Sequence, residues 1–442
     1  MHSPLLEELE YNRRSFLAMV GKGVGLATLA SASVGTLFND LKASVKKIEH
    51  LPADATASDE DFWVDIQKSF SVSRSIINLN NGGVSPSPRL VTEAFVRYTW
   101  QQEDVTAYTM WQILEPQSET VRTGLAEIFG CDREEIAITR NASESLEICL
   151  MGLNLKSGDE ILTTTQDYPR MLTTLRQREL REGISLKMIK IPIAPKHLEE
   201  ITKEFDKAIT PRTKVILLSH VINLTGQVIP VKEICDLAKP KGIEVIVDGA
   251  HSFAHFDFKQ KDINCDYYGT SLHKWLFAPK GTGLLFVKKE KIEQLWPLMA
   301  AEKKQANDIR KFEEIGTHPA APRLAIGEAI LFHNAIGAKR KEERLRYLSR
   351  YWMNKLKDLS NVRFNTSWEP NQSCGIANIE IVGVDPGKLA AYLMDKHKIF
   401  TVPIIHDEFK GLRITPSVYT ALYELDRFCG VMETVSKKGL PG

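Results

Sequence analysis

Short runs of aliphatic and β-branched residues recur along the chain from about residue 75, and they predict strands. The runs occupy residues 136–139, 160–163, 187–191, 215–218, 245–248 and 283–287. Most of them are nearly continuous in apolar residues, which is typical of strands covered on both faces in a mainly parallel sheet. Helix-length segments, such as 143–153 and 231–239, lie between the runs. This alternation predicts an α/β domain with helices on both sides of the sheet.

The pattern changes after about residue 322. A long helical pattern rich in Lys, Arg and Glu covers residues 324–356 and predicts a helix that leads into a second domain. Further strands are predicted at 376–381, 400–402 and 412–414, with helices at 386–396 and near Glu424. We therefore predict three regions: a signal and tether over residues 1–61, a large domain over 62–320, and a smaller α/β domain over 321–442.

Composition narrows the class of protein. The 442 residues include 57 basic and 56 acidic side chains, so the net charge is +1, and 43% of the residues are hydrophobic. These are the proportions of a globular protein, and the near-neutral charge does not favour nucleic acid or an anionic membrane as a partner. The six cysteines form no CxxC pair, which argues against a disulfide scaffold and against a cysteine-based zinc site. We predict no metal site.

The N-terminal segment over residues 11–37 resembles a twin-arginine export signal. Arg13 and Arg14 are followed by Ser-Phe-Leu, a mildly apolar stretch rich in Ala and Gly, and Ala-Ser-Ala at residues 30–32. Lys22 interrupts the apolar stretch, which argues against a membrane-spanning helix. The prediction is an exported or periplasmic protein that meets the membrane only during export. An ordinary amphipathic N-terminal helix is the alternative.

The segment over residues 267–283 contains the most informative lysine of the chain. Lys274 follows an apolar strand, has His273 and Trp275 as neighbours, and precedes a loop that ends in two glycines. A lysine amine attacks an aldehyde only when it is partly deprotonated, and burial near another cation favours that state. A solvated surface charge is the other interpretation of a lysine in such a loop.

Other polar and aromatic residues that could contact a single ligand come directly after further predicted strands. Asp248 ends a buried strand, where a carboxylate can hold a pyridine nitrogen protonated or, alternatively, cap a helix. Residues 139–145 join a strand to a helix and offer small residues at the helix N-terminus, which binds anions. Asn223 supplies an amide and Tyr168 an aromatic ring after two further strands. A lysine, an acid, an anion cradle, an amide and an aromatic plate at one sheet edge are what pyridoxal 5′-phosphate requires.

Two motifs carry a family resemblance. With SLHKWLFAPKGTG at residues 271–283 and VIVDGAH at 245–251, the chain from about residue 78 to its end resembles the class V aminotransferase family of fold-type I pyridoxal-phosphate enzymes, in particular its isopenicillin-N-epimerase-like members. The resemblance implies a large domain with a mainly parallel seven-stranded sheet and a smaller α/β C-terminal domain.

The resemblance also implies roles for individual residues. Lys274 would form a Schiff base with the cofactor and later move the α-proton, and Asp248 would pair with the pyridine nitrogen. Tyr168 would stack on the outer face of the ring, although a core aromatic is the alternative for this residue. Further cofactor contacts would come from Ala142, Ser143, Asn223, Ala250, His251, Ser271 and His273.

The remaining carried-over residues concern the substrate and a second subunit. Gly316 and Thr317 resemble the loop that reaches the phosphate of the neighbouring subunit, which would make the protein a homodimer with a shared active site; a simple turn is the alternative. Arg413 resembles the arginine that binds the substrate carboxylate, a task suited to its planar guanidinium, and a surface ion pair is the alternative. Asn81 and Gly82, with their neighbours Asn80 and Gly83, would line the substrate cleft.

The reaction is less constrained than the cofactor. Cysteine desulfurases of this family carry a nucleophilic cysteine shortly before the substrate arginine, and residues 382–413 contain none. An epimerase needs a second proton donor, for which Tyr168, His318 and His406 are candidates. We predict an aminotransferase acting at the Cα of an amino-acid substrate, with an epimerase or a C–S/C–N lyase as the alternative. A catalytically silent binding protein and a periplasmic solute-binding protein are weaker alternatives, and the substrate itself stays open.

Overall fold

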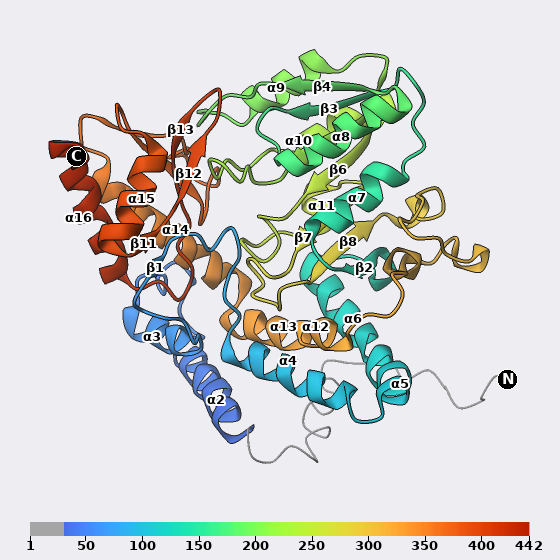
Figure 1. The fold of residues 1–442 in the computed structure, drawn as a ribbon, viewed down its shortest axis with the longest axis horizontal. Helices are drawn as coiled ribbons and strands as arrows, with labels where there is room; N and C mark the ends of the chain where they lie inside the picture. The colour runs from blue at the N-terminus through green and yellow to red at the C-terminus, as the bar shows by residue number, and fades with distance from the viewer. Residues whose placement is uncertain (1–30, 442) are drawn as a thin grey trace.

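The computed structural model describes residues 31–441, and its centre is a seven-stranded sheet (Figure 1). The strands lie in the order β2-β8-β7-β6-β5-β3-β4. All pairings are parallel except the two made by β8, so β8 runs against the other six strands of this sheet. The predicted α/β class with a mainly parallel sheet is therefore confirmed. The strand bounds are β2 Ile136–Thr139, β3 Glu160–Thr164, β4 Ser185–Ile189, β5 Thr213–Ser219, β6 Glu244–Asp248, β7 Tyr267–Ser271 and β8 Gly283–Val287.

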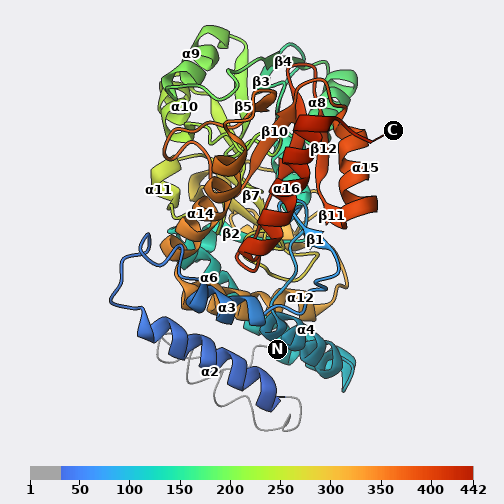
Figure 2. The ribbon, with the colours of Figure 1, turned by 90° about the vertical axis from the view of Figure 1, so that its left-hand side faces the viewer.

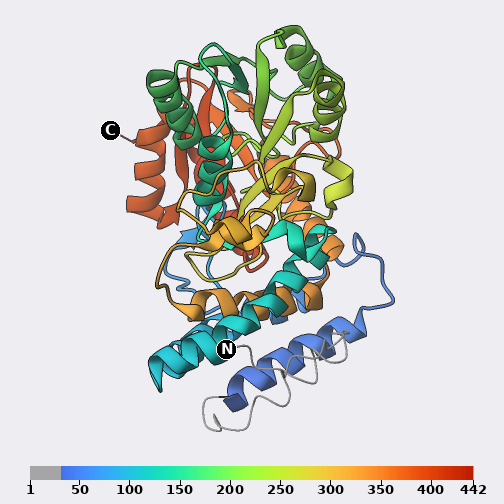
Figure 3. The same ribbon diagram turned by 90° about the vertical axis from the view of Figure 1, so that its right-hand side faces the viewer.

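Alternate residues of these strands enter two separate apolar cores. In β5, Ile216 and Leu218 belong to the core on one face, whereas Val215 and Leu217 belong to the core on the other. Successive strand side chains point to opposite faces, so a strand with a core on each side must be apolar at almost every position. Helices accordingly lie on both faces of the sheet (Figure 3). They are α6 Ser118–Phe129, α7 Ala142–Gly152, α8 Pro169–Glu182, α9 Glu199–Ala208, α10 Val231–Ala238 and the short α11 Gln260–Ile263.

A smaller domain packs beside the large one and has its own antiparallel sheet in the order β12-β13-β10-β9. A third apolar core joins this sheet to α14 (Ala338–Leu356), α15 and α16, through residues such as Trp352, Leu393 and Phe428. The N-terminal strand β1 pairs in parallel with β11, so an early segment of the chain joins the smaller domain. The bounds are β1 Ile77–Asn78, β9 Val362–Phe364, β10 Ala377–Ile381, α15 Pro386–His397, β11 Ile399–Phe400, β12 Val402–Ile405, β13 Lys410–Ile414 and α16 Leu422–Lys438.

The long helix predicted over residues 324–356 is wrong in one respect, because the segment forms separate helices. These are α12 Ala320–Leu324, α13 Ile326–Ile336 and α14 Ala338–Leu356. Gly337 lies between α13 and α14 with φ of +90°, a conformation that suits glycine and ends a right-handed helix. Residues of α12 and α13, among them Leu324, Ile326 and Ile330, belong to the core of the large domain.

Part of the predicted tether, residues 31–61, contains helical structure that packs against the body of the protein. Helix α2 (Ser31–Lys47) contacts α4 (Arg89–Gln102), α13 and α3 (Glu60–Lys68), and it lies along the lower edge of the molecule in Figure 2. Leu41, Trp63 and Ile66 are almost fully buried in a fourth core, and the buried Arg344 of α14 forms an ion pair with Glu60. Burial of large apolar side chains holds this segment against the body of the protein.

Most of the predicted twin-arginine segment, residues 11–30, lies outside the described residues. Within residues 31–441 no helix is both long and apolar enough to cross a membrane. The N-terminal export signal therefore stays a prediction.

Candidate active site

The predicted site residues follow strands that end at one edge of the large sheet. Asp248 ends β6, Ser271 ends β7 and Thr139 ends β2. Because these strands run in the same direction, their carboxyl ends meet at the edge where α/β sheets bind ligands. Lys274 lies in the turn that follows β7. Local sequence places each group after a strand, and the parallel sheet then brings the groups together.

The Lys274 amine lies in a largely desolvated place. Its Nζ is 3.2 Å from Nε2 of His251. Burial lowers the pKa of the ammonium to about 8; Asp248 opposes this shift and Arg413 adds to it. A lysine with such a pKa is partly neutral near pH 7 and can act as a nucleophile or a base.

Asp248 faces the same desolvation, which shifts the pKa of its carboxyl in the opposite direction. Its side chain is buried, and burial raises the pKa of the carboxyl to about 6. The amide of Ala250 donates a hydrogen bond of 2.9 Å to Oδ1, and Lys274 also favours the carboxylate, while Asp167 disfavours it. Asp248 is thus a buried acid at the strand end, ready to pair with a cationic ring nitrogen.

Asp167, the residue before Tyr168, is a structural carboxylate that the sequence analysis did not single out. Its Oδ2 accepts hydrogen bonds from Thr163 and from the amide and hydroxyl of Thr164, and its Oδ1 accepts two from Ser219. These bonds join the ends of β3 and β5. The available signal was an acidic residue directly after a buried strand, at the same edge as Asp248.

The predicted anion cradle lies at the N-terminus of α7. Asn141 caps the helix through a hydrogen bond from the amide of Glu144 to Oδ1. The amide of Ala142 donates to Oγ of Ser271, which ties the cradle to the end of β7 at 2.9 Å. A Cβ on Gly283 would lie 2.6 Å from the Asn141 backbone, so only glycine allows this close approach. A helix N-terminus held beside the lysine loop suits a phosphate.

Arg413 of β13 reaches the large domain from the smaller one. Its guanidinium donates to Oδ1 of Asn80 at 2.8 Å and to the carbonyl of Asn223 at 3.2 Å. Its Nε has no hydrogen-bond partner among the described residues, although it is buried. Burial lowers the pKa of Arg413 to about 10, and the nearby Tyr168, whose side chain is 42% exposed, opposes the shift. Arg413 is therefore a buried cation beside Lys274, as a carboxylate site requires.

Asn81, predicted to line the substrate cleft, has its side chain bonded within the protein. Its amide nitrogen donates to the carbonyls of Asn78 and Thr415, and its Oδ1 accepts from the Tyr419 hydroxyl. These bonds use its polar atoms and bury it, so Asn81 fastens the segment to the smaller domain. Its neighbour Asn80 holds Arg413. The amide of Gly82 bonds the hydroxyl of Thr415 at 3.0 Å.

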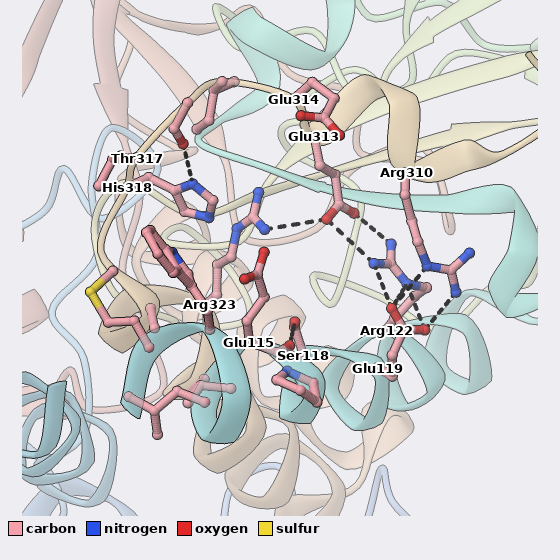
Figure 4. A pocket seen from close by; sticks show the side chains of 18 of the residues that line it. Glu115, Ser118, Glu119, Arg122, Arg310, Glu313, Glu314, Thr317, His318 and Arg323 are labelled. Atoms are coloured by element: carbon pink, nitrogen blue, oxygen red, sulfur yellow. Dashed lines mark hydrogen bonds and ion pairs between the residues drawn. The ribbon is translucent and has the colours of Figure 1, made fainter. Parts of the chain in front are cut away.

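Gly316 and Thr317 line a pocket of about 570 Å³, which none of the residues around Lys274 lines (Figure 4). Gly316 has φ of +75°, and its carbonyl is 2.9 Å from Nδ1 of His318. Glu313 lies between Arg122 and Arg323 in this pocket and also accepts a hydrogen bond from the amide of Ile138 (Figure 4). Within one chain, the lysine site and the Thr317 loop are thus separate.

The residues around Lys274 fit pyridoxal 5′-phosphate. Oδ1 of Asn223 and Nδ1 of His273 are buried and have no hydrogen-bond partner among the described residues, which is expected of groups that contact a ligand. A lysine with a lowered pKa, a buried acid and a helix N-terminus complete the set of groups that this cofactor needs.

The chain belongs to the class V aminotransferase family, whose model matches residues 77–402. This membership confirms the predicted fold class and the predicted cofactor, pyridoxal 5′-phosphate. The protein is thus a pyridoxal-phosphate enzyme of this family.

Curated relatives and solved structures agree with this class. The chain is 28% identical to isopenicillin N epimerase of Streptomyces clavuligerus, over 85% of this chain and 98% of the relative. It is 25% identical to a probable cysteine desulfurase of Pyrococcus abyssi, over 84% of this chain and 97% of the relative. The fold is similar to that of an apo cysteine desulfurase from Thermococcus onnurineus, with a TM-score of 0.75 and 24% identity over 85% of this chain and 98% of that one.

Proposed function

We propose that this protein is an aminotransferase that acts at the Cα of an amino acid. The observation that carries the proposal is the buried pair of Lys274 and Asp248, in which the amine has a depressed pKa and the acid a raised one. When bound, pyridoxal 5′-phosphate supplies a carbonyl for the amine and a ring that accepts electrons from Cα. Lys274 then takes the proton from Cα.

The other residues bind and orient. Asp248 would hold the proton on the ring nitrogen, because its buried carboxylate is stabilised by a positive partner. The N-terminus of α7 and the Ser271 hydroxyl would hold the phosphate. Arg413 binds the substrate carboxylate through the planar guanidinium that Asn80 orients.

The thiols of the chain do not favour a persulfide reaction. Burial raises the pKa of Cys235, Cys374 and Cys429 to about 12, and it also raises the pKa of the other three thiols. A nucleophilic cysteine needs an exposed site that stabilises its thiolate. Residues 382–413 contain no cysteine. This supports transamination over desulfuration despite the similarity to cysteine desulfurases.

Epimerisation is the second candidate. The relatives named isopenicillin N epimerase match over 98% and 99% of their lengths, which favours it. It also requires a proton donor opposite Lys274. Tyr168 is the candidate with support, since it is partly exposed and close enough to Arg413 to affect its charge.

One experiment separates the two candidates. We expect the holoprotein, incubated in deuterated water with L- and D-amino acids, to exchange the α-proton of its substrates. Transamination predicts a keto acid product and the pyridoxamine form of the cofactor, with configuration retained in the remaining substrate. Scrambled configuration without keto acid would assign epimerisation instead. Absence of exchange with every amino acid would overturn both.

A homodimer with a shared active site is the second part of the proposal. Three exposed aromatic side chains, Trp100, Tyr108 and Trp111, lie on α4 and the segment that follows it in sequence, and Trp111 lines the pocket of Thr317. Exposed large apolar side chains of this kind support a protein interface here. Light scattering should give twice the chain mass, and Trp111→Glu should yield monomers that bind the cofactor less tightly. An active monomer would contradict the shared site.

Export is the third part of the proposal. The paired Arg13 and Arg14 support a twin-arginine signal. Replacing both by lysine should retain the protein in the cytoplasm of the producing cell, whereas replacing Lys22 and Lys42 by arginine should not. Equal export of both variants would remove this proposal.

A further inference from the structure

Trp275, the residue after Lys274, is held in one orientation by three contacts. Its ring stacks on His255 with centroids 3.6 Å apart and planes 1° from parallel. Its carbonyl accepts a hydrogen bond from the buried amine of Lys341. Its indole Nε1 lies 3.3 Å from Nδ1 of His251 and donates to it. Together these contacts direct the indole N–H at His251.

The backbone fixes His255 in turn. Its Nδ1 is 2.7 Å from the carbonyl of His251, which can only accept, so Nδ1 carries the proton. Its Nε2 then accepts the hydrogen bond of 2.8 Å from the amide of Gly375. The ring against which Trp275 stacks therefore has one tautomer and one orientation.

The indole contact determines the tautomer of His251. An indole N–H can only donate, so Nδ1 of His251 must be unprotonated. Burial, together with the charges of Lys274 and Arg413, holds the pKa of His251 well below its usual range, so the ring is neutral. A neutral imidazole with a bare Nδ1 carries its proton on Nε2. That nitrogen is the one 3.2 Å from Nζ of Lys274.

This tautomer discriminates between the two states of Lys274. A neutral amine can accept the Nε2–H of His251, whereas an ammonium would present N–H groups to an N–H group. Other groups that face the amine are Asp248 from β6, which favours the ammonium, and Arg413 from β13, which disfavours it.

We propose that Trp275 is a positioning residue that fixes His251 in its Nε2–H tautomer, so that the imidazole donates to Nζ of Lys274 and keeps the nucleophile neutral. The inference rests on the proposed role of Lys274. Its first consequence, the tautomer, belongs to the protein without cofactor and can be measured there.

The test uses nitrogen NMR of the cofactor-free full chain with ¹⁵N-labelled histidine, because bare and protonated imidazole nitrogens have well-separated shifts. The His251 signals are assigned by their loss in His251→Gln. We expect a bare Nδ1 and a protonated Nε2. In Trp275→Phe, which keeps an aromatic ring without the N–H, we expect a mixture of tautomers. A proton on Nδ1 in the unaltered protein would overturn the proposal whether or not the variant folds.

The second readout is the rate at which the cofactor-free protein captures pyridoxal 5′-phosphate across pH. At pH 7 we expect Trp275→Phe to be slower by about fivefold, the value of one hydrogen bond. The difference should vanish at high pH, where Lys274 is neutral in both proteins. A deficit that is equal at every pH would mean that Trp275 acts only through packing.

The control is Trp352→Phe. Trp352 is a buried tryptophan of the smaller domain, and its Nε1 has no partner among the described residues. The Trp352→Phe variant should change neither the tautomer of His251 nor the pH profile of cofactor capture. Failure of the proposed function gives a different result from failure of the tautomer, because a protein that never captures the cofactor on Lys274 can still show the Nε2–H form of His251.

Discussion

The lysine site and the Thr317 pocket both contain buried ionisable residues, but the first favours their neutral forms and the second favours their charged forms. Around Lys274, burial without hydrogen-bonded counterions lowers the pKa of the amine to about 8 and raises that of Asp248 to about 6. In the Thr317 pocket, Glu119 lies within hydrogen-bond distance of Arg122 and Arg310, and these contacts lower its pKa to about 2. One region favours neutral groups and the other favours ions.

The difference shows that burial alone does not determine whether a site is reactive. An ion with hydrogen-bonded counterions keeps its charge and serves structure, whereas a group that is desolvated without them shifts toward neutrality. Chemistry is therefore expected at Lys274, and rigidity at Glu313. Each prediction below tests one side of this comparison.

The largest effect is expected for Lys274→Ala. Loss of the nucleophile and base should reduce turnover about a thousandfold or more, ~4 kcal/mol in activation free energy, because proton transfer at Cα loses its catalyst. The absorption band of the bound cofactor, which borohydride should abolish in the unaltered protein, should be missing. A variant that keeps the band would contradict the assignment of Lys274.

The next effect concerns stability in the ion-pair region. Glu313→Gln should lower the free energy of unfolding by about 3 kcal/mol, because it leaves the buried Arg122 and the partly buried Arg323 without their shared carboxylate. Urea denaturation measures this. The control is Glu134→Gln, whose more exposed pair with Arg310 should contribute only about 0.5 kcal/mol. Equal effects would remove the distinction between buried and exposed pairs.

A smaller effect is expected for Arg413→Lys. The variant keeps the charge but loses the planar fork, so KM for the amino acid should rise about 30-fold, ~2 kcal/mol, with little change in cofactor affinity. Steady-state kinetics and cofactor titration separate the two quantities. Arg97→Lys, at an exposed pair with Glu328, is the matched control. Equal weakening of substrate and cofactor binding would move Arg413 out of the substrate role.

The smallest effect is the pH dependence of cofactor capture. The pKa of Lys274 is lowered by burial to about 8, so the fraction of neutral amine rises with pH and levels off above about pH 9. Capture by the cofactor-free protein should accelerate about fivefold between pH 7 and 8. With an ordinary lysine, the rate of capture would instead keep rising up to about pH 10. A rise that continues to pH 10 would show that the amine is not desolvated.

Sequence patterns predicted the elements that depend on local periodicity. The runs at residues 136–139 and 283–287 coincide with β2 and β8, since strands with a core on each face need apolar residues throughout. The long helix over residues 324–356 was predicted without its break, because the left-handed conformation of Gly337 leaves no periodic signal. The burial of Leu41, inside the predicted tether, had no local signal because it depends on partners far along the chain.

The sequence by itself determined that Lys274 and Asp248 follow strands of one parallel sheet and therefore share an edge. Only the tertiary structure decided which neighbours control their charge. Arg122 and Glu313 are 191 residues apart, and Trp275 meets His251 across two loops. Asn80 and Asn81 are adjacent, yet only one reaches Arg413. The physical reason is that pKa and hydrogen bonding depend on distances in space, which local patterns of residue type do not encode.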